Sequence, residues 1–463
     1  MLYFSWRIVY PVSGKCLKGM LFMTLDMTRG KPTRLLIRFA MPLILSSLLQ
    51  QLYTMCDSVI VGRLLGTDAF AAVGSASYLN WFTLSMIIGA SNGFGVALSQ
   101  RFGAHDQEGY RRFFAAAFVL MIVIGVLIST FGVVFLQNLL AMLNTPPELL
   151  GHAVRYVRVL WSGLLLTALL NMLTAALRAA GDSRTPFISL VVSTVLNIAL
   201  DFLLIGWFGM GVEGAALATV LSEGAAAAWC LLQILRLKLW PAKGMWRLRL
   251  QEIRELLRLG IPPLLSQGVI ATGELAVLAA INSFGVVYVT GTTAARRYFS
   301  LFNVVGTGLE GALATFTGQN WGAGQKQRIM QGTRAAVTMG ATSSVIIAVA
   351  IMLTAKWLIG VFIPASSAEA LRIGTEALCA EVLFLPALYL LCEYRASIQG
   401  MGNAVLPMIS GFLELALRLI AAWLLPIIAG SVGLYFTDAV TWTVTAVMLA
   451  VSYYVLRRKH LMA

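Results

Sequence analysis

The sequence predicts an all-α polytopic membrane protein with about twelve transmembrane helices in two six-helix lobes. The first observation behind this prediction is composition: the 463 residues are 59% hydrophobic and 12% charged, whereas a soluble domain is typically about 25% charged. The second is the recurrence of apolar runs of about 18 residues or more, each long enough to cross a hydrocarbon core of about 30 Å as a helix. The third is an internal repeat of about half the chain length.

Each predicted span is a mainly apolar segment that polar or basic residues separate from the next. The predicted spans are 36–62, 70–98, 113–138, 152–178, 186–206, 212–236, 258–284, 291–318, 333–358, 371–396, 406–428 and 431–456. They divide the chain into an N-terminal lobe (36–236) and a C-terminal lobe (258–456). The remaining residues form a basic N-terminal segment (1–35), a basic linker (237–257) and a short tail (457–463).

Lys and Arg residues gather on alternate connections between the predicted spans. The formal net charge of +14 would also suit a nucleic-acid binder, but the basic clusters, such as the linker, would all lie on one side of a membrane. The opposite loops keep isolated cases such as Arg63 and Lys356. Because cytoplasmic loops carry the excess of Lys and Arg, we expect a multi-pass protein of the cell (inner) membrane. Both termini would be cytoplasmic, and no nucleic acid would be bound.

Two pairs of short segments align at nearly equal offsets. LRAAGDSRTPFIS (177–189) aligns with IQGMGNAVLPMIS (398–410) at an offset of 221, and SQRFGAHD (99–106) aligns with GQNWGAGQ (318–325) at an offset of 219. The matched residues include Gln100 with Gln319, Gly103 with Gly322, Gly181 with Gly402, and Pro186 with Pro407. Six spans per half is an even number, so the halves would enter the membrane in the same orientation. A pseudo-two-fold axis along the membrane normal would relate the lobes across a central cleft, which suits alternating access.

Polar residues interrupt the apolar spans of the N-terminal lobe. Asp57 lies near the outer end of the first span, and Tyr53 precedes it by one turn on the same face. Asn197 and Asp201 share one face of the fifth span, and Thr219 lies at comparable depth on the sixth. An ionisable group in a span costs about 2.5 to 3.5 kcal/mol. We expect these residues to converge on a pocket of oxygen ligands for Na⁺ or a proton; the alternative is that each Asp only hydrogen-bonds a neighbouring helix.

Charged residues also lie in the predicted spans of the C-terminal lobe. Glu414 and Arg418, four residues apart, are expected to form an intramembrane ion pair with a structural role, or alternatively a role in gating or substrate binding. Arg296 and Arg297 occupy the eighth span, where one would line the cleft and the other would reach a lobe interface. Glu310 would face the cavity. Further single cases are Glu223, Glu274, Glu376, Glu381 and Asp438.

Motifs of enzymes and nucleotide-binding proteins do not occur in the sequence. The five Cys form no CxxC pair, the three His are scattered, and no GxxxxGK[ST] loop is present, so neither a zinc site nor a P-loop is predicted. Gly306, Gly308 and Gly311 form a literal GxGxxG, but the motif lies inside a predicted span and is expected to be a helix-packing face. We therefore expect no enzymatic activity and no cofactor beyond a coupling ion.

Several segments together resemble the multidrug and toxic compound extrusion (MATE) family over residues 27–456. The segments are MPLILSSLLQQLYTMCDSVIVGRLLG, LRAAGDSRTPF, LNIALDFLLIGWFGMGVEGAALAT, INSFG and TGQNWGAG. The resemblance implies a twelve-helix, two-lobed exporter of organic, often cationic compounds in exchange for Na⁺ or H⁺. In members with an N-lobe acidic pair, the ion site is similar to Tyr53, Asp57, Asn197, Asp201 and Thr219, and Pro42 matches a proline that permits bending of the first helix.

The second half departs from another branch of the family, which carries an acidic residue shortly after the proline that opens the seventh span. Here Gln267 lies early in that span and Glu274 is displaced along it. The departure favours an ion site in the N-terminal lobe.

The sequence thus favours a monomeric secondary antiporter whose partners are small organic substrates and membrane lipids. A flippase of lipid-linked precursors in the same superfamily is the alternative, with Arg296, Arg297 and Arg418 as candidate ligands of a pyrophosphate. A non-transporting scaffold or receptor is a third possibility. It would not explain why the lobes are duplicated or why acidic residues lie within the spans.

Overall fold

The computed structural model describes residues 24–142, 147–364 and 366–462, and every regular element within them is a helix. The helices of the first half are α1 (Pro32–Leu65), α2 (Thr67–Gly103), α3 (Gln107–Met142), α4 (Pro147–Ser162), α5 (Leu164–Ala179), α6 (Arg184–Asp201), η1 (Phe202–Trp207) and α7 (Gly211–Arg236). Those of the second half are η2 (Lys243–Trp246), α8 (Leu250–Asn282), α9 (Val286–Gly322), α10 (Lys326–Phe362), α11 (Ala368–Leu383), α12 (Leu385–Gly400), α13 (Val405–Ala429), η3 (Gly430–Phe436), α14 (Thr437–Leu456) and η4 (Arg457–Leu461).

Two of the spans are broken into pairs of shorter helices. The pair α4 and α5 bends by 48°, and the pair α11 and α12 bends by 42°. The bends fall at Gly163 and Phe384, which are 221 residues apart, the offset of the sequence repeat. Pro386 at the start of α12 cannot donate a backbone hydrogen bond, which favours the second break. The two halves therefore share a fold down to the position of a helix break.

The described residues contain twelve membrane spans. Eight helical segments are long and apolar enough to cross a membrane, and the two bent pairs raise the number to ten. The segment 405–461 divides into α13 and α14, and α9 is as long as the other spans although it carries Arg296, Arg297 and Glu310. The predicted fold class, an all-α membrane protein of about twelve helices in two lobes, is confirmed.

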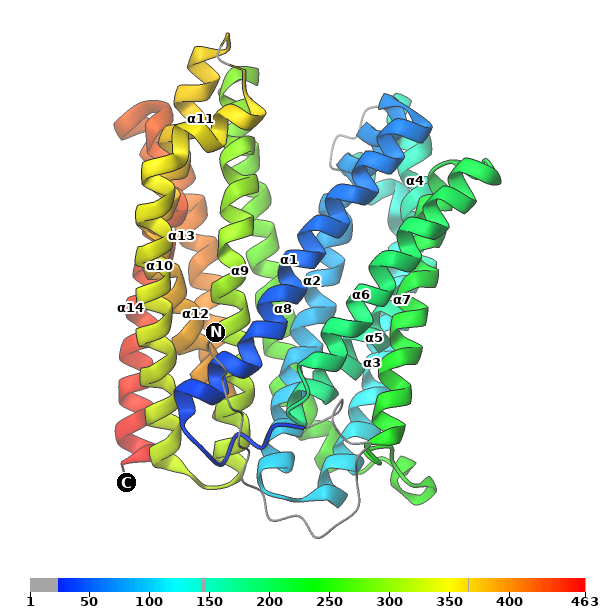
Figure 1. Cartoon of the computed structure of the whole chain (residues 1–463), viewed down its shortest axis with the longest axis vertical. Helices are drawn as coiled ribbons and strands as arrows, with labels where there is room; N and C mark the ends of the chain where they lie inside the picture. The colour runs from blue at the N-terminus through cyan, green and yellow to red at the C-terminus, as the bar shows by residue number, and fades with distance from the viewer. Residues whose placement is uncertain (1–23, 143–146, 365, 463) are drawn as a thin grey trace, which may run out of the picture.

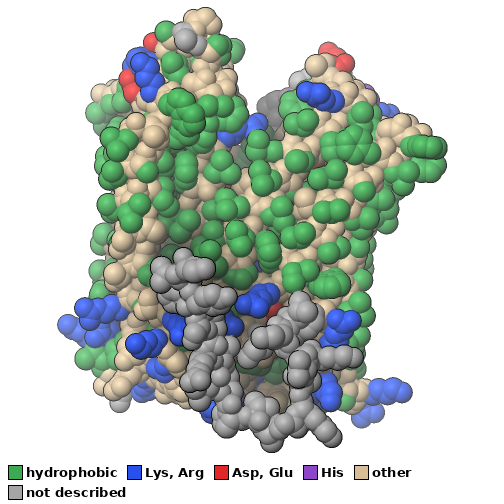
Figure 2. Space-filling view, in the orientation of Figure 1, with side chains coloured by type: hydrophobic (Ala, Val, Ile, Leu, Met, Phe, Trp, Pro, Cys, Tyr) green, Lys and Arg blue, Asp and Glu red, His purple; other side chains and the backbone are tan. Residues whose placement is uncertain are grey.

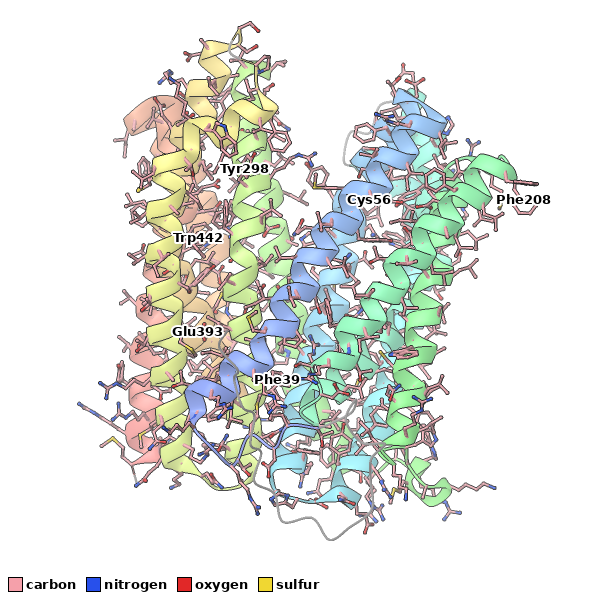
Figure 3. The ribbon with its side chains drawn as sticks, in the orientation of Figure 1. Phe39, Cys56, Phe208, Tyr298, Glu393 and Trp442 are labelled. Carbon is pink, nitrogen blue, oxygen red and sulfur yellow. The ribbon has the colours of Figure 1, made fainter. Side chains whose placement is uncertain are left out.

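The helices form two groups that diverge toward one end of the molecule. In Figure 1, α1 to α7 incline to the right, α9 to α14 stand on the left, and α8 lies between them. Figure 2 shows the surface hollowed between the upper ends of the two groups, apolar side chains across the middle of this face, and Lys and Arg side chains gathered at the lower end. We call these ends the upper and lower faces. Figure 3 places Phe39 in the lower part and Cys56 in the upper part of α1.

Glycines bring helices of the two halves into close contact. A Cβ on Gly89 would lie 2.5 Å from the backbone oxygen of Pro263, and one on Gly93 would lie 2.2 Å from that of Leu259. These distances leave no space for a side chain between α2 and α8. In the GxGxxG of α9, a Cβ on Gly306 would lie 2.7 Å from the ring of Tyr389, so the expected packing role of this motif is confirmed.

Two glutamines hold the halves together near the lower face. Gln100 Nε2 in α2 donates to the backbone oxygen of Gly400 at 2.9 Å, and Gln319 Nε2 in α9 donates to that of Ala179, also at 2.9 Å. The glutamines are 219 residues apart and their acceptors 221, so each bond is the counterpart of the other under the internal repeat. We call Gln100, Ala179, Gln319 and Gly400 the lower clasp.

The ends of α2 and α9 cross backbone to backbone beside this clasp. A Cβ on Gly103 would lie 1.9 Å from the backbone oxygen of Gln319, and one on Gly322 would lie 1.8 Å from that of Gln100. These two glycines are also equivalent under the repeat. The pseudo-two-fold axis therefore passes through a crossing that only glycine permits.

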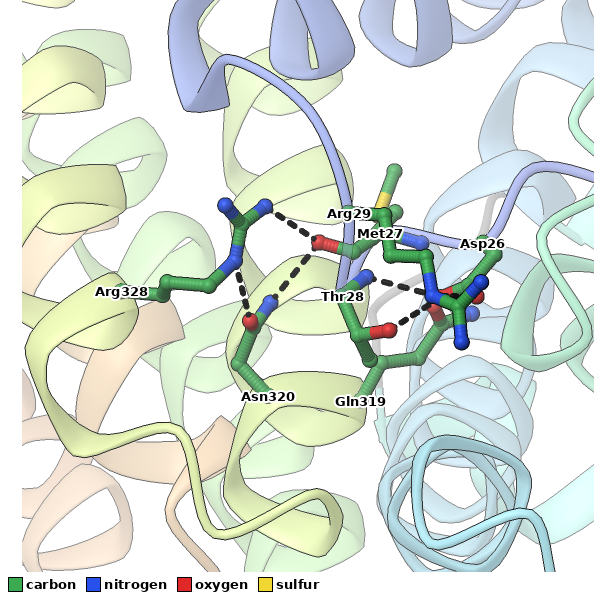
Figure 4. A network of polar contacts seen from close by, with 7 residues as sticks. All are labelled: Asp26, Met27, Thr28, Arg29, Gln319, Asn320 and Arg328. Carbon is green, nitrogen blue, oxygen red and sulfur yellow. Dashed lines mark hydrogen bonds and ion pairs between the residues drawn. The ribbon is translucent and has the colours of Figure 1, made fainter.

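The segment that precedes α1 breaks this symmetry by joining the clasp from one side (Figure 4). Met27 donates its backbone N–H to Gln319 Oε1 at 2.9 Å, and its backbone oxygen accepts from Asn320 Nδ2 at 3.1 Å and from Arg328 Nη2 at 3.0 Å. Leu25 donates to the backbone oxygen of Gly181 at 2.9 Å. The segment thus spans from the first half to the second across the lower face.

Candidate cation site

Three helices of the first half bring the five polar residues of the N-terminal lobe together. Asp57 and Tyr53 lie on α1, Asn197 and Asp201 on α6, and Thr219 on α7, and these helices pack against one another. Tyr53 Oη lies 3.3 Å from Thr219 Oγ1. Cys56, which Figure 3 places in the upper part of α1, is the neighbour of Asp57, so the cluster lies in the upper half of the lobe.

The amide of Asn197 links α6 to α7. In the orientation that gives both ends a partner, Asn197 Nδ2 donates to Asp201 Oδ2 at 3.2 Å and Asn197 Oδ1 accepts from the backbone N–H of Thr219 at 3.2 Å. The Asn197 and Asp201 side chains are fully buried. The hydrogen bond from Asn197 holds the Asp201 carboxylate in place. The other carboxylate oxygen, Oδ1, remains available to a proton or a cation.

The carboxyl groups of Asp57 and Asp201 lie within hydrogen-bonding reach of each other. Oδ1 of Asp57 and Oδ1 of Asp201 are both buried and accept no hydrogen bond from any described residue. Two ionised carboxylates in such a position repel each other, and these two Oδ1 atoms receive no donor from the described residues that would stabilise their charge. A shared proton or a bound cation satisfies both oxygens.

Asp201 owes its position to the end of α6. It is the last residue before η1, a π-helical segment in which the helix widens. Gly209 and Gly211 then adopt positive φ angles of 66° and 61° and turn the chain into α7. π-segments within α-helices are frequent at functional sites. The residues that follow Asp201 read as continuous apolar helix, so sequence periodicity does not predict this feature.

Two further residues belong to the surroundings of this cluster. Glu223 lies one turn after Thr219 on α7 and accepts a hydrogen bond from Thr167 Oγ1 of α5. Tyr156 of α4 is buried and lies close enough to Asp57, Asp201 and Glu223 to interact with their charges. The spacing of four residues from Thr219 was a usable signal for Glu223, whereas Tyr156 comes from a helix that no pattern linked to the site.

Pro42 interrupts the hydrogen bonding of α1 well below this cluster. It lies inside α1, and Ser46 Oγ donates to its backbone oxygen at 2.8 Å. Proline removes one backbone donor from a helix interior. It precedes Asp57 by fifteen residues, about 22 Å along the helix. A change of direction at Pro42 would therefore displace Asp57 relative to α6.

The expected ion pair between Glu414 and Arg418 does not form. Glu414 pairs with Arg395 of α12, and Arg418 Nε bonds Asp438 Oδ1 of α14 at 2.8 Å. Their spacing on α13 allowed a pair, but each side chain meets a partner on a different neighbouring helix. Arg395 was not among the residues singled out in the sequence.

Two further charged residues of the second half lie beside these ion pairs. Arg296 Nη2 lies 3.7 Å from Asp438 Oδ2 and thereby joins Arg418, while the adjacent Arg297 is exposed. Glu310 lies near Arg395 and within hydrogen-bonding reach of Cys392.

Glu393 is a further buried acid that sequence reasoning missed. Its side chain is fully buried, and neither carboxylate oxygen has a hydrogen-bond partner among the described residues. Figure 3 places it in the lower half of the second group of helices. The described part of the chain contains no cluster of three or more His, Cys, Asp or Glu suited to a metal ion, so the N-lobe cluster offers two carboxylates supplemented by amide and hydroxyl oxygens.

Comparison with known proteins supports the duplicated architecture. The MatE family model matches the chain twice, over residues 42–203 and 262–424. The chain is 31% identical over 361 residues to the probable multidrug resistance protein YpnP of Bacillus subtilis, covering 78% of this chain and 81% of that protein. It is 28% identical over 387 residues to the probable multidrug resistance protein NorM of Thermotoga maritima, covering 82% of each.

The fold has a solved counterpart. It is similar to the outward-facing conformation of a multidrug resistance MATE family transporter of the MOP superfamily, with a TM-score of 0.86 and 23% identity over 96% of this chain and 98% of that one. The double family match and the relatives that share most of its length show that this chain belongs to the MATE family of multidrug efflux transporters.

Proposed function

We propose that the protein is a secondary antiporter that exports organic, often cationic compounds in exchange for Na⁺ or H⁺. The observation that carries this proposal is the pair of buried carboxylate oxygens, Oδ1 of Asp57 and Oδ1 of Asp201, which no donor satisfies. Tyr53, Asn197 and Thr219 complete the set of oxygen and amide groups around them. We place the monomer in the cell (inner) membrane with its lower, basic face and both termini toward the cytoplasm.

The proposed cycle follows from the charge of the acidic pair. With both carboxylates ionised, the pair favours a cationic compound taken up from the cytoplasmic side. A Na⁺ or H⁺ entering from the upper face binds between the two carboxylates and relieves the repulsion between Asp57 and Asp201. The change lets α1 reposition about Pro42, and the compound leaves at the upper face. The ion and the compound compete for the same negative charge, so the pair binds only one of them at a time. The ion is therefore carried inward and the compound outward.

Alternating access requires the lower face to open in one half of the cycle. The lobes 36–236 and 258–456 would move against each other with the linker 237–257 as their covalent connection. In the present conformation the hollow is at the upper face (Figure 2) and the lower clasp joins the lobes. We propose that the clasp stabilises the outward-facing state and breaks when the lower face opens.

Removing both clasp side chains is expected to shift this equilibrium. Gln100→Ala/Gln319→Ala removes three hydrogen bonds, the two of the clasp and the one that Gln319 accepts from Met27. At about 1 kcal/mol each, their loss favours the inward-facing state by about 150-fold. Spin labels at the exposed Lys243, whose helix η2 packs against α3 of the first half, and at the exposed Lys326 of α10 report the change as a longer distance measured by double electron–electron resonance. Gln137→Ala, an exposed glutamine of α3, is the control and should leave the distance distribution unchanged. An unchanged distribution in the double variant would contradict a gating role for the clasp.

The ion pairs of the second half favour the antiporter over the flippase alternative. Two of the three arginines offered as pyrophosphate ligands, Arg296 and Arg418, are engaged with Asp438. Both relatives described above are named as multidrug resistance proteins. The duplicated lobes and the buried acidic pair also speak against a non-transporting scaffold.

Transport in a purified system tests the proposed function. Proteoliposomes loaded with a fluorescent organic cation are given either an inwardly directed Na⁺ gradient or an acid-outside pH gradient, each without the other. We expect one of the two gradients to accelerate efflux relative to vesicles without a gradient. If neither gradient changes efflux of any organic cation tried, the antiport proposal is wrong.

A further inference from the structure

A cavity of about 550 Å³ lies at the lower end of the second half, away from the acidic pair. Its lining comes from α10, α12, α14 and η4, and includes Gln331, Arg334, Tyr394, Tyr453, Tyr454 and Arg457. We call it the tyrosine–arginine pocket. The proposed transport cycle uses none of these residues.

We infer the depth of the pocket in the membrane from its place at the basic end of the molecule, which corresponds to the lipid headgroups. Arg457 directly follows the end of α14, and Arg334 lies eight residues into α10, about 12 Å from its first residue. The start of α10 and the end of α14 lie at the lower end of the molecule, near the C-terminus (Figure 1), which is the end where Lys and Arg side chains gather (Figure 2). Tyr and Arg residues at such a position are typical of the interface between membrane and water.

The pocket carries positive charge that no described residue neutralises. No Asp or Glu lines it. Neither Arg334 nor Arg457 forms an ion pair with any residue that the structure describes, and Arg457 Nε is buried without an acceptor. A buried guanidinium N–H without a partner is costly, so this site calls for an anion with oxygen acceptors.

Three tyrosines form the aromatic part of the pocket lining. The ring centroids of Tyr394 and Tyr453 are 5.4 Å apart, those of Tyr453 and Tyr454 are 5.6 Å apart, and those of Tyr394 and Tyr454 are 6.2 Å apart. The guanidinium of Arg457 lies 5.9 Å from the centroid of Tyr454. Guanidinium groups bind phosphate oxygens in a forked geometry, and tyrosine hydroxyls add further donors.

An apolar stripe continues from the pocket toward the middle of the membrane. Val447, Val451 and Val455 follow one another at intervals of four residues on α14, and each is 59% exposed. Val447 and Val451 share a helix face with Tyr454. A ligand with a phosphate head and long apolar chains fits this succession of surfaces, whereas free phosphate would use the pocket alone.

We propose that the tyrosine–arginine pocket binds the phosphate headgroup of an anionic phospholipid from the leaflet at the lower face, with the acyl chains lying along α14. Arg334 and Arg457 contact the phosphate oxygens, and the tyrosines enclose the headgroup. The lipid thereby joins the ends of α10, α12 and α14.

Lipid binding to purified protein tests this proposal. The full-length chain in detergent is titrated with phosphatidylglycerol, phosphatidylcholine or inorganic phosphate, and bound ligand is counted by native mass spectrometry. We expect phosphatidylglycerol to be retained in preference to phosphatidylcholine. Arg334→Gln/Arg457→Gln should weaken its retention by about thirtyfold, since each cation near the membrane surface contributes about 1 kcal/mol. The single variant Arg334→Gln, at an exposed position, should weaken it by about fivefold.

The control removes the same charge beside the pocket. Arg458→Gln/Lys459→Gln changes two exposed cations of η4 that do not line it, and should retain the lipid as the wild type does. If this control loses phosphatidylglycerol to the same extent, the basic surface in general attracts the lipid, and the proposal is overturned. Equal retention of both lipids, or occupancy of the pocket by inorganic phosphate with no lipid preference, would also overturn it.

Discussion

Asp201→Asn is expected to abolish the acceleration of efflux by an ion gradient. The substitution keeps the size of the side chain but removes the negative charge that the ion and the substrate would share. Coupling between two ligands is typically worth about 1 to 3 kcal/mol, so its loss should reduce gradient-driven efflux by roughly 5- to 150-fold. Asp57→Asn should have a similar effect. Initial rates of efflux of a fluorescent organic cation from proteoliposomes measure it.

An equivalent substitution outside the cluster provides the control. Asp68→Asn changes an exposed aspartate in the first turn of α2 and should leave gradient-driven efflux unchanged. The amount of protein in the vesicles is measured for each variant. Wild-type acceleration in both Asp57→Asn and Asp201→Asn would mean that the pair is structural and that the ion binds elsewhere.

Arg395→Met is expected to cause the largest loss of stability of any single substitution considered for this chain. It leaves Glu414, which is only 3% exposed, without its partner. Breaking a buried ion pair in this way costs about 3 to 5 kcal/mol, because an uncompensated charge remains. We expect a clear fall in the midpoint of thermal unfolding in detergent, measured by tryptophan fluorescence. Substrate binding should persist at temperatures where the variant is folded.

The double variant separates charge burial from packing. Arg395→Met/Glu414→Leu replaces both partners by apolar side chains, and we expect it to recover most of the lost stability. Arg372→Met is the exposed counterpart: Arg372 pairs with Glu369 and Glu376 near the start of α11, and its side chain is 54% exposed. Its loss should leave the midpoint of thermal unfolding close to that of the wild type, because exposed ion pairs contribute little to stability. If the double variant is less stable than Arg395→Met, the proposed cause of the instability is wrong.

The spans could be predicted because hydropathy reflects the membrane directly. The predicted segment 113–138 lies within α3 and 333–358 within α10, but both helices extend several residues beyond the apolar run. The bend at Gly163 could not be predicted from the apolar run around it, whereas Pro386 was a usable signal for the bend at Phe384. Once one bend is known, the offset of the repeat gives the position of the other.

The cluster around Asp57 and Asp201 could be predicted because intramembrane acids are costly and rare. The ion-pair partners of Glu414 and Arg418 could not be predicted. These two residues have suitable spacing on one helix, yet Arg395 and Asp438 approach them from other helices. Gln100 and Gln319 were matched only as parts of a repeat. Their reciprocal bonds depend on the crossing of α2 and α9, which short-range patterns do not encode.

Competition between ion and substrate at the acidic pair is the central claim, and an equilibrium titration tests it most directly. The dissociation constant of a fluorescent organic cation is measured in lipid nanodiscs against Na⁺ concentration at fixed pH, and against pH at fixed Na⁺. The account predicts that one of the two ions weakens binding to the wild type and that Asp201→Asn removes this dependence. Binding to the wild type that neither ion affects, or the same ion dependence in Asp201→Asn, would contradict it.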